Sequence, residues 1–330
     1  MTTAALSSKA LEEIQHIADR FPETTSFVAT GSIVEGLGNQ NSDIDLYAIS
    51  EGSPPGQTTA IGIRESQYID CEYMRLASVA QLCERVSEAG WAGLETLSLR
   101  ELDRFYRIAI SIPVRVSDTV AAVLDGFSQS VACHAFGRYA VLRAYEHTCR
   151  AACALANGAD IEALVFLREG ALWHAAARLA EAGEGYPSLK WTGEKAARRF
   201  GRDTAAFDEL LEGYLRPGRV QDAIPALRSR ISVPDELLEL TGARAGRLAD
   251  GVRLIDDEDD VYLVKPGGSM LRVPAGPAAT VCRHLAAGLD WSQATGATAA
   301  AAGLPTAELA TAVWCGTQNL RIHEFLCPCS

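Results

Sequence analysis

The stretch VATGSIVEGLGNQNSDIDLYAI, residues 28–49, carries the strongest indication of the fold. Its first three residues are the end of the apolar run SFVAT (26–30), and this run predicts a short buried strand. The run breaks at Gly31-Ser32, where a short helix is expected to start, and further glycines follow. The segment IDLYAI (44–49) then predicts a second strand. Two short strands joined through a glycine-rich turn indicate a small mixed α/β domain.

Two acids stand at the start of the second predicted strand. In a strand, residues two apart face the same way, so Asp43 and Asp45 point from one face while Ile44 and Leu46 point into the core. Neighbouring carboxylates repel each other, and a divalent cation between them offsets that cost. Mg²⁺ prefers carboxylate and phosphate oxygens as ligands. The pair therefore predicts a magnesium site.

The corner formed by Gly31 and Ser32 predicts a site for phosphate groups. Backbone N–H groups at a turn that enters a helix form a concave anion site. Glycine has no Cβ, so Gly31 allows a triphosphate to approach the backbone closely. The hydroxyl of Ser32 can donate a hydrogen bond to a terminal phosphate. A phosphate cradle beside a metal pair is the equipment for in-line nucleotidyl transfer.

A third acid is needed to hold a second metal ion or to activate an acceptor hydroxyl. The segment SQYIDCEYMR (66–75) alternates like a strand and offers Asp70 and Glu72 on one face. We favour Asp70 because it comes first and follows the apolar Ile69, and Glu72 stays the alternative. The second of these acids would line the acceptor pocket or reach solvent.

Each part of this pattern is weak by itself, because a lone pair of aspartates is often a solvated strand edge. Here ten residues separate Ser32 from Asp43, strands are expected on both sides, and a second acidic strand follows. The combination favours a catalytic site.

The chain of 330 residues is too long for one ordinary core. We expect three domains, over residues 1–125, 126–245 and 246–330. The first is the mixed α/β part, in which 51–60 reads as a loop, 77–90 as a helix and 105–117 as ending in a β-prone stretch. The second predicts a helical bundle, with helices at 130–156, 160–182, 192–200, 203–213 and 219–230. The third predicts a β-hairpin followed by helices at 276–288 and 305–321, a winged-helix-like arrangement.

Bulk composition narrows the class of partner. The net charge of −12, with no Lys/Arg-rich block, disfavours a long nucleic acid as substrate. The N-terminus has no apolar run typical of a signal peptide, and no stretch approaches the roughly 18–20 apolar residues of a membrane span. The nine irregularly spaced cysteines are typical of reduced thiols. We therefore expect a cytoplasmic protein without a membrane partner.

The segment GSIVEGLGNQNSDIDLYAI resembles the signature of the polymerase-β-like nucleotidyltransferases: Gly-Ser, a spacer, then acid–apolar–acid. Among these, the chain is most similar to the aminoglycoside nucleotidyltransferases, in which a helical bundle follows the core. The resemblance implies an α+β nucleotidyltransferase core, with a small mixed sheet and helices, that uses two Mg²⁺ ions and an NTP. ATP is the expected nucleotide.

The resemblance also implies roles for individual residues. Asp43 and Asp45 would bind the metals, Asp70 would match the third acid, and Gly31 and Ser32 would hold the phosphates. The segment LREGALWHAAARLAEAGEGYPSLKWTGEKAARRF (167–200) adds to the likeness. A Lys-Trp element lies near the nucleotide in such proteins, so Lys190 is expected to reach the phosphates, with a solvated surface lysine as the alternative.

The last part of the chain is similar to a different family. GVRLIDDEDDVYLVKPGGSMLRV (251–273) and the helix after it resemble PqqD-like peptide-recognition domains, which bind a peptide as an added strand. A plain packing or dimerisation module is the alternative.

Three functions stay open on the sequence. The leading one moves an NMP, with AMP expected, from an NTP to a hydroxyl of a small molecule such as an antibiotic or a pathway intermediate. In the second, the acceptor is a peptide or protein held by residues 246–330. The third is a nucleotide-binding scaffold without catalysis, which the intact acid pair disfavours.

Overall fold

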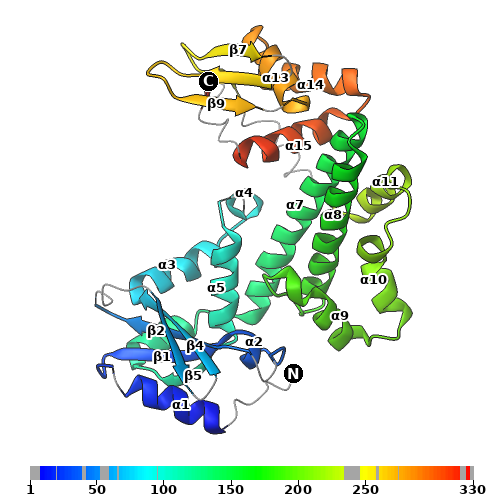
Figure 1. Ribbon diagram of the computed structural model, residues 1–330. Helices are drawn as coiled ribbons and strands as arrows, with labels where there is room; N and C mark the ends of the chain where they lie inside the picture. The colour runs from blue at the N-terminus through cyan, green and yellow to red at the C-terminus, as the bar shows by residue number, and fades with distance from the viewer. Residues whose placement is uncertain are drawn as a thin grey trace. The chain divides into compact units, whose positions relative to one another are not determined.

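The computed structural model describes residues 8–19, 21–38, 42–52, 59–64, 67–94, 96–233, 246–257, 260–273, 275–319 and 325–327. The chain divides into two compact units, one of residues 1–139 and 176–202 and one of residues 140–175 and 203–330 (Figure 1). The two longest helices, α7 (Gln129–Ala156) and α8 (Asp160–Glu181), contribute residues to both units. The architecture is mixed α+β.

Five strands form the sheet of the first unit in the order β3-β4-β2-β1-β5. β2 and β4 run parallel, whereas the other neighbours are antiparallel, so the small sheet is mixed as the sequence predicted. The strands are β1 (Thr25–Thr30), β2 (Ile44–Ser50), β3 (Thr59–Arg64), β4 (Gln67–Arg75) and β5 (Ile112–Arg115).

The two faces of this sheet pack against different helices. Ile44 and Leu46 of β2 are buried in one cluster with Ile14 of α1 (Ser8–Ala18), as their alternation predicted. Tyr47 and Ile49 belong to the cluster on the opposite face, to which α3 (Leu76–Ser87), α5 (Leu99–Ala109), α6 (Asp118–Leu124) and the first part of α7 also contribute. Figure 1 labels α3 and α5 beside the sheet. The short α4 (Trp91–Leu94) adds a buried leucine to the same cluster.

One prediction for the first unit is wrong in part. Residues 53–58 of the predicted loop over 51–60 lie outside the described part of the chain, and its last two residues belong to β3, which begins at Thr59 and pairs antiparallel with β4. The stretch 105–117 ends in a strand as predicted, since β5 covers Ile112–Arg115, and its first residues belong to the helix α5, which ends at Ala109. A capping box at Ser98 and Glu101 starts α5, and its buried residues Leu102 and Phe105 follow helical spacing.

The predicted helices between 130 and 230 are all confirmed. A 3₁₀ turn, η1, precedes α9, and Pro225 lies inside α11. Besides α7 and α8, these elements are η1 (Leu189–Trp191), α9 (Thr192–Phe200), α10 (Ala205–Leu215) and α11 (Val220–Arg230).

The C-terminal part is a small α+β module within the second unit. Its three strands form an antiparallel sheet in the order β7-β8-β9, which includes the predicted hairpin, and β6 pairs with β10. The predicted helices at 276–288 and 305–321 are present, and a third helix covers the alanine-rich 294–302. The elements are β6 (Arg247–Leu248), β7 (Arg253–Asp257), β8 (Asp260–Val264), β9 (Met270–Val273), α13 (Pro277–Ala286), α14 (Trp291–Ala302), α15 (Thr306–Asn319) and β10 (Leu326–Cys327).

The predicted domain boundaries stay predictions. The boundary at 125/126 falls in the short connection between α6 and α7. The boundary at 245/246 borders residues 234–245, which lie outside the described part of the chain.

Candidate active site

Parallel pairing of β2 with β4 brings the predicted acids together. In this register Asp45 lies opposite Asp70, and Tyr47 lies opposite Glu72. Paired residues of neighbouring strands share a face, so Asp45 and Asp70 project from the face that packs against α5. Asp43 lies just before β2 and is exposed.

Asp45 is the most enclosed of these acids. Its Oδ1 accepts a hydrogen bond of 3.0 Å from Nη1 of Arg107 on α5. Burial raises the pKa of Asp45; Arg107 opposes that rise, while the charges of Asp70 and Asp43 add to it. The three aspartates are therefore close enough to repel one another, which is the electrostatic condition that a cation relieves.

Gly31 makes room for the Asp45 carboxylate. It has a φ of +82°, and a Cβ added there would lie 1.9 Å from Oδ2 of Asp45. Only glycine accepts both the backbone conformation and the close approach. The predicted phosphate turn and the first strand acid are thus in direct contact.

The turn that Gly31 begins is compact. The helix α2 (Gly31–Val34) has four residues, and the carbonyl of Ser32 accepts bonds from the N–H groups of Leu37 (2.9 Å) and Gly38 (2.8 Å). Ser32 is partly exposed. A helix this short has little dipole, so any anion binding here would rest on turn N–H groups and the Ser32 hydroxyl.

The two acids of β4 differ in their partners. Glu72 forms ion pairs with Arg104, and with Arg100 at 3.5 Å. Asp70 is exposed, and within the described ranges neither it nor Asp43 has a basic partner. This difference favours Asp70 over Glu72 as the acid available to a metal or a proton.

Sequence reasoning missed the contribution of α5. Arg100, Arg104 and Arg107 recur at helical spacing and meet the acids of β2 and β4. Arg107 also pairs with Asp103, with 2.8 Å between Nε and Oδ2. The signal was present in LRELDRFYRIA, whose basic stripe appears once the segment is read as a helix.

Lys190 lies in η1 and is exposed. Its Nζ is 5.1 Å from the centroid of the Trp191 ring. Burial raises the pKa of Asp103, and Arg107 and Lys190 oppose that rise. Lys190 is therefore within electrostatic reach of α5.

The residues fit Mg²⁺ in their chemistry. Asp43, Asp45 and Asp70 supply only carboxylate oxygens, the donors that this ion prefers. Across the part of the chain that the structure describes, no three His, Cys, Asp or Glu side chains converge as a finished metal cage. Mg²⁺ seldom needs such a cage when substrate phosphates complete its shell.

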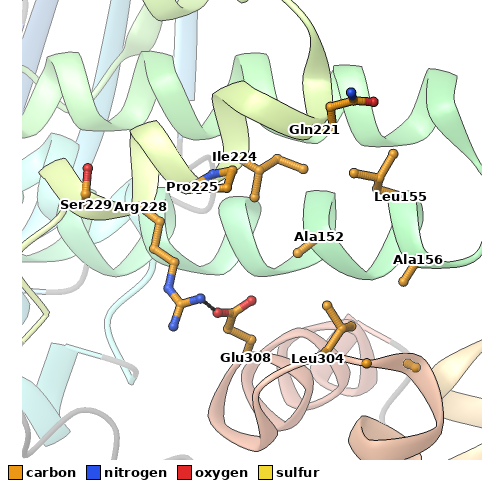
Figure 2. Close-up of a pocket in the computed structure, with 12 residues that line it drawn as sticks. Ala152, Leu155, Ala156, Gln221, Ile224, Pro225, Arg228, Ser229, Leu304 and Glu308 are labelled. Carbon is orange, nitrogen blue, oxygen red and sulfur yellow. Dashed lines mark ion pairs between the residues drawn. The ribbon is translucent and has the colours of Figure 1, made fainter.

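A separate hollow of about 600 Å³ lies in the second unit (Figure 2). Leu155, Ile224 and Leu304 give it an apolar lining, and Arg228 of α11 forms an ion pair with Glu308 of α15 at its edge. Glu308 is the one acid among the described residues that line it, and it is paired with Arg228. The hollow therefore lacks a cluster of acids like that on the β2–β4 face.

No protein-family model and no curated protein matches the chain. Among solved structures, a nucleotidyltransferase-like protein from Exiguobacterium sibiricum 255-15 is similar, with 13% identity and a TM-score of 0.41. The similarity covers 75% of this chain and 82% of that one. Likeness at this level does not establish shared chemistry. No helix in the described ranges is long and apolar enough to cross a bilayer.

Proposed function

We propose that the chain is a Mg²⁺-dependent nucleotidyltransferase that moves an NMP, AMP in the first instance, from an NTP to a hydroxyl of a small molecule and releases pyrophosphate. One observation carries the proposal: the β2–β4 register sets Asp45 beside Asp70, while Gly31 packs against the Asp45 carboxylate. A carboxylate cluster thereby adjoins a turn that can hold phosphates.

Two ions are expected: Asp43 and Asp45 would hold the ion that accompanies the nucleotide, and Asp70 would help to hold only the second ion. Mg²⁺ bound there would neutralise triphosphate charge during in-line displacement. Arg107 would keep Asp45 oriented, because its guanidinium already holds one carboxylate oxygen. The N–H groups after Gly31, the Ser32 hydroxyl and the ammonium of Lys190 would bind phosphate oxygens.

Asp70 would accept the proton of the acceptor hydroxyl. Its carboxylate is exposed and has no basic partner in the described ranges, whereas Glu72 is occupied by Arg104. Glu72 would then keep Arg104 in place beside the reacting groups. The net charge of −12 favours a small acceptor over a long nucleic acid.

A peptide acceptor is the second candidate, and one observation favours it. β7 is an edge strand, and its Ile255 is 52% exposed. An open strand edge can pair with an extended peptide. In this version the chemistry is unchanged, and residues 246–330 hold the acceptor.

Calorimetric titration of the protein with ATP, once with Mg²⁺ and once with EDTA, tests the nucleotide site. A pyrophosphate-release assay with hydroxyl-bearing acceptors then tests the transfer reaction. The wild type should bind ATP more tightly with Mg²⁺, and Asp70→Asn should lose about 10²–10⁴-fold in turnover while keeping nucleotide affinity within a few-fold. Glu72→Gln is the matched variant, and it should lose much less turnover than Asp70→Asn, because a glutamine oxygen can still accept a hydrogen bond from Arg104. ATP binding that ignores Mg²⁺ would refute the metal site; an inactive Glu72→Gln beside an active Asp70→Asn would exchange the two roles.

A further inference from the structure

Four charged side chains meet at the end of the predicted phosphate turn. They are Glu35, Glu184, Lys195 and Arg198, all in the first unit. The side chain of Lys195 is 2% exposed and that of Glu35 is 4% exposed. Burying a charge is costly unless it is paired and hydrogen-bonded. The cluster balances two acids with two bases.

Glu35 is the centre of this cluster. Its Oε1 accepts hydrogen bonds from Nζ of Lys195 (2.6 Å) and Nη2 of Arg198 (2.8 Å). Its Oε2 accepts from the hydroxyl of Tyr106 (2.8 Å), and its backbone carbonyl accepts from Nη1 of Arg198 (2.9 Å). Burial by itself would raise the pKa of Glu35, but Lys195, Arg198 and Tyr106 outweigh it and lower the pKa. The carboxylate is therefore held ionised from three directions.

Lys195 is fixed as closely as its partner. Its ammonium also donates to the hydroxyl of Tyr106 (3.1 Å) and to the carbonyl of Gly185 (3.4 Å), and it lies 3.7 Å from Glu184. The rings of Tyr106 and Tyr186 lie 5.2 Å and 5.3 Å from it, within cation–π range. Enclosed in this way, Lys195 is placed to hold another residue and not to touch a substrate.

The residue that it holds belongs to the phosphate turn. Glu35 ends α2, and its N–H bonds the carbonyl of Gly31 at 3.0 Å. Tyr106, the third partner of Glu35, precedes Arg107, which holds Asp45. Two adjacent residues of α5 thus donate hydrogen bonds to the site: Tyr106 to Glu35 at the end of the turn, and Arg107 to Asp45.

We propose that Glu35 and Lys195 are positioning residues, whose buried ion pair fixes the Gly31–Gly38 turn in the conformation that receives the nucleotide phosphates. The role of the turn rests on the proposed function. The pair acts through the backbone that it fixes, and neither side chain is a catalytic residue.

Two variants separate positioning from mere stability. Lys195→Met leaves a buried carboxylate with fewer partners and should destabilise the first unit. Glu35→Gln/Lys195→Met removes both charges at similar volume, and such neutral replacements of buried pairs commonly recover stability. A structural role predicts that the double variant recovers ATP affinity as well. A positioning role predicts that stability returns while affinity for Mg²⁺–ATP stays lower by about tenfold or more, the effect of losing one hydrogen bond to a charged phosphate.

The experiment combines thermal melting, amide hydrogen exchange of the Gly31–Gly38 peptide and titration of ATP with Mg²⁺. In the double variant we expect a near-normal melting temperature, faster exchange in that peptide and weakened ATP binding. Arg202→Ala, which breaks the exposed Arg202–Glu194 pair at 2.7 Å involving the same helix, is the control and should change none of these.

Wild-type exchange together with wild-type ATP affinity in the double variant would overturn the proposal. If wild-type protein binds no ATP, the proposed function is wrong. Positioning of the turn would then be decided by exchange alone, with faster exchange supporting it and unchanged exchange overturning it.

Discussion

Replacing Gly31 by alanine tests the contact between the Gly31–Gly38 turn and Asp45, the first acid of β2. Gly31 has a φ of +82°, and its missing Cβ would stand 1.9 Å from Oδ2 and 2.6 Å from Cγ of Asp45. The carboxylate cannot move freely, because Arg107 holds its other oxygen at 3.0 Å. Gly31→Ala must therefore strain the backbone and displace Asp45 together.

The cost has three parts. A left-handed φ costs an alanine about 1–2 kcal/mol. Turning Asp45 off its rotamer costs about 0.5–1.5 kcal/mol. Weakening its bond to Arg107 costs about 1–2 kcal/mol, toward the low end for a charged hydrogen bond since both groups are about a quarter exposed. Together these amount to about 3–5 kcal/mol, or a fall in melting temperature of about 6–20 °C for a unit of this size.

Thermal melting followed by circular dichroism measures the effect. Gly183→Ala is the matched control in the same unit, because Gly183 has a φ of +79° with no atom near the added Cβ. Gly183→Ala should lose only about 1–2 kcal/mol, which is what a left-handed φ costs an alanine. In an Asp45→Ala background, Gly31→Ala should cost less, because the clashing carboxylate is gone. Equal losses for Gly31→Ala and Gly183→Ala would refute the reasoning.

Two further predictions concern charged groups. Burial raises the pKa of Asp45 above its usual 3.8, although Arg107 opposes the rise. The native protein therefore keeps the Asp45 carboxyl protonated to a higher pH than the unfolded chain does. The free energy of unfolding then falls as the pH rises above 3.8 toward the raised pKa. In EDTA, Asp45→Asn should flatten this fall and keep or raise the melting temperature at pH 7, and a clearly lower melting temperature would contradict this. In a separate assay with Mg²⁺, the same variant should lower the proposed transfer activity by orders of magnitude. In the second unit, Arg228→Ala leaves Glu308, whose side chain is 4% exposed, without its cation. Urea unfolding should show a loss of about 1–3 kcal/mol, discounted because Arg228 is 42% exposed, and Arg228→Ala/Glu308→Gln should recover most of it. No recovery in the double variant would count against the pairing.

Local sequence patterns were sufficient to predict most of the helices and strands. Alternation placed Ile44 and Leu46 in the core and aimed the aspartates at the other face, because strand side chains alternate over two residues. Helical spacing between 130 and 230 was equally readable, since each helix shows its period over many residues. Short or mixed segments such as β3 and α5 were missed in part, because few residues carry the period and apolar runs suit either structure.

Long-range packing alone established the partners of the site. Consecutive strands most often pair with each other, yet β2 pairs with β4 in parallel and with β1 on its other side, and this register sets Asp45 against Asp70. Arg107 meets Asp45 across 62 positions, and Lys195 meets Glu35 across 160. The residues next to Lys190 and Lys195 in the sequence do not indicate which lysine is buried. Glu35, the acid that offsets the cost of burying Lys195, comes from a turn 160 positions away. Motifs thus reveal which chemistry a chain can carry, while its tertiary contacts decide which charges are held and which stay available.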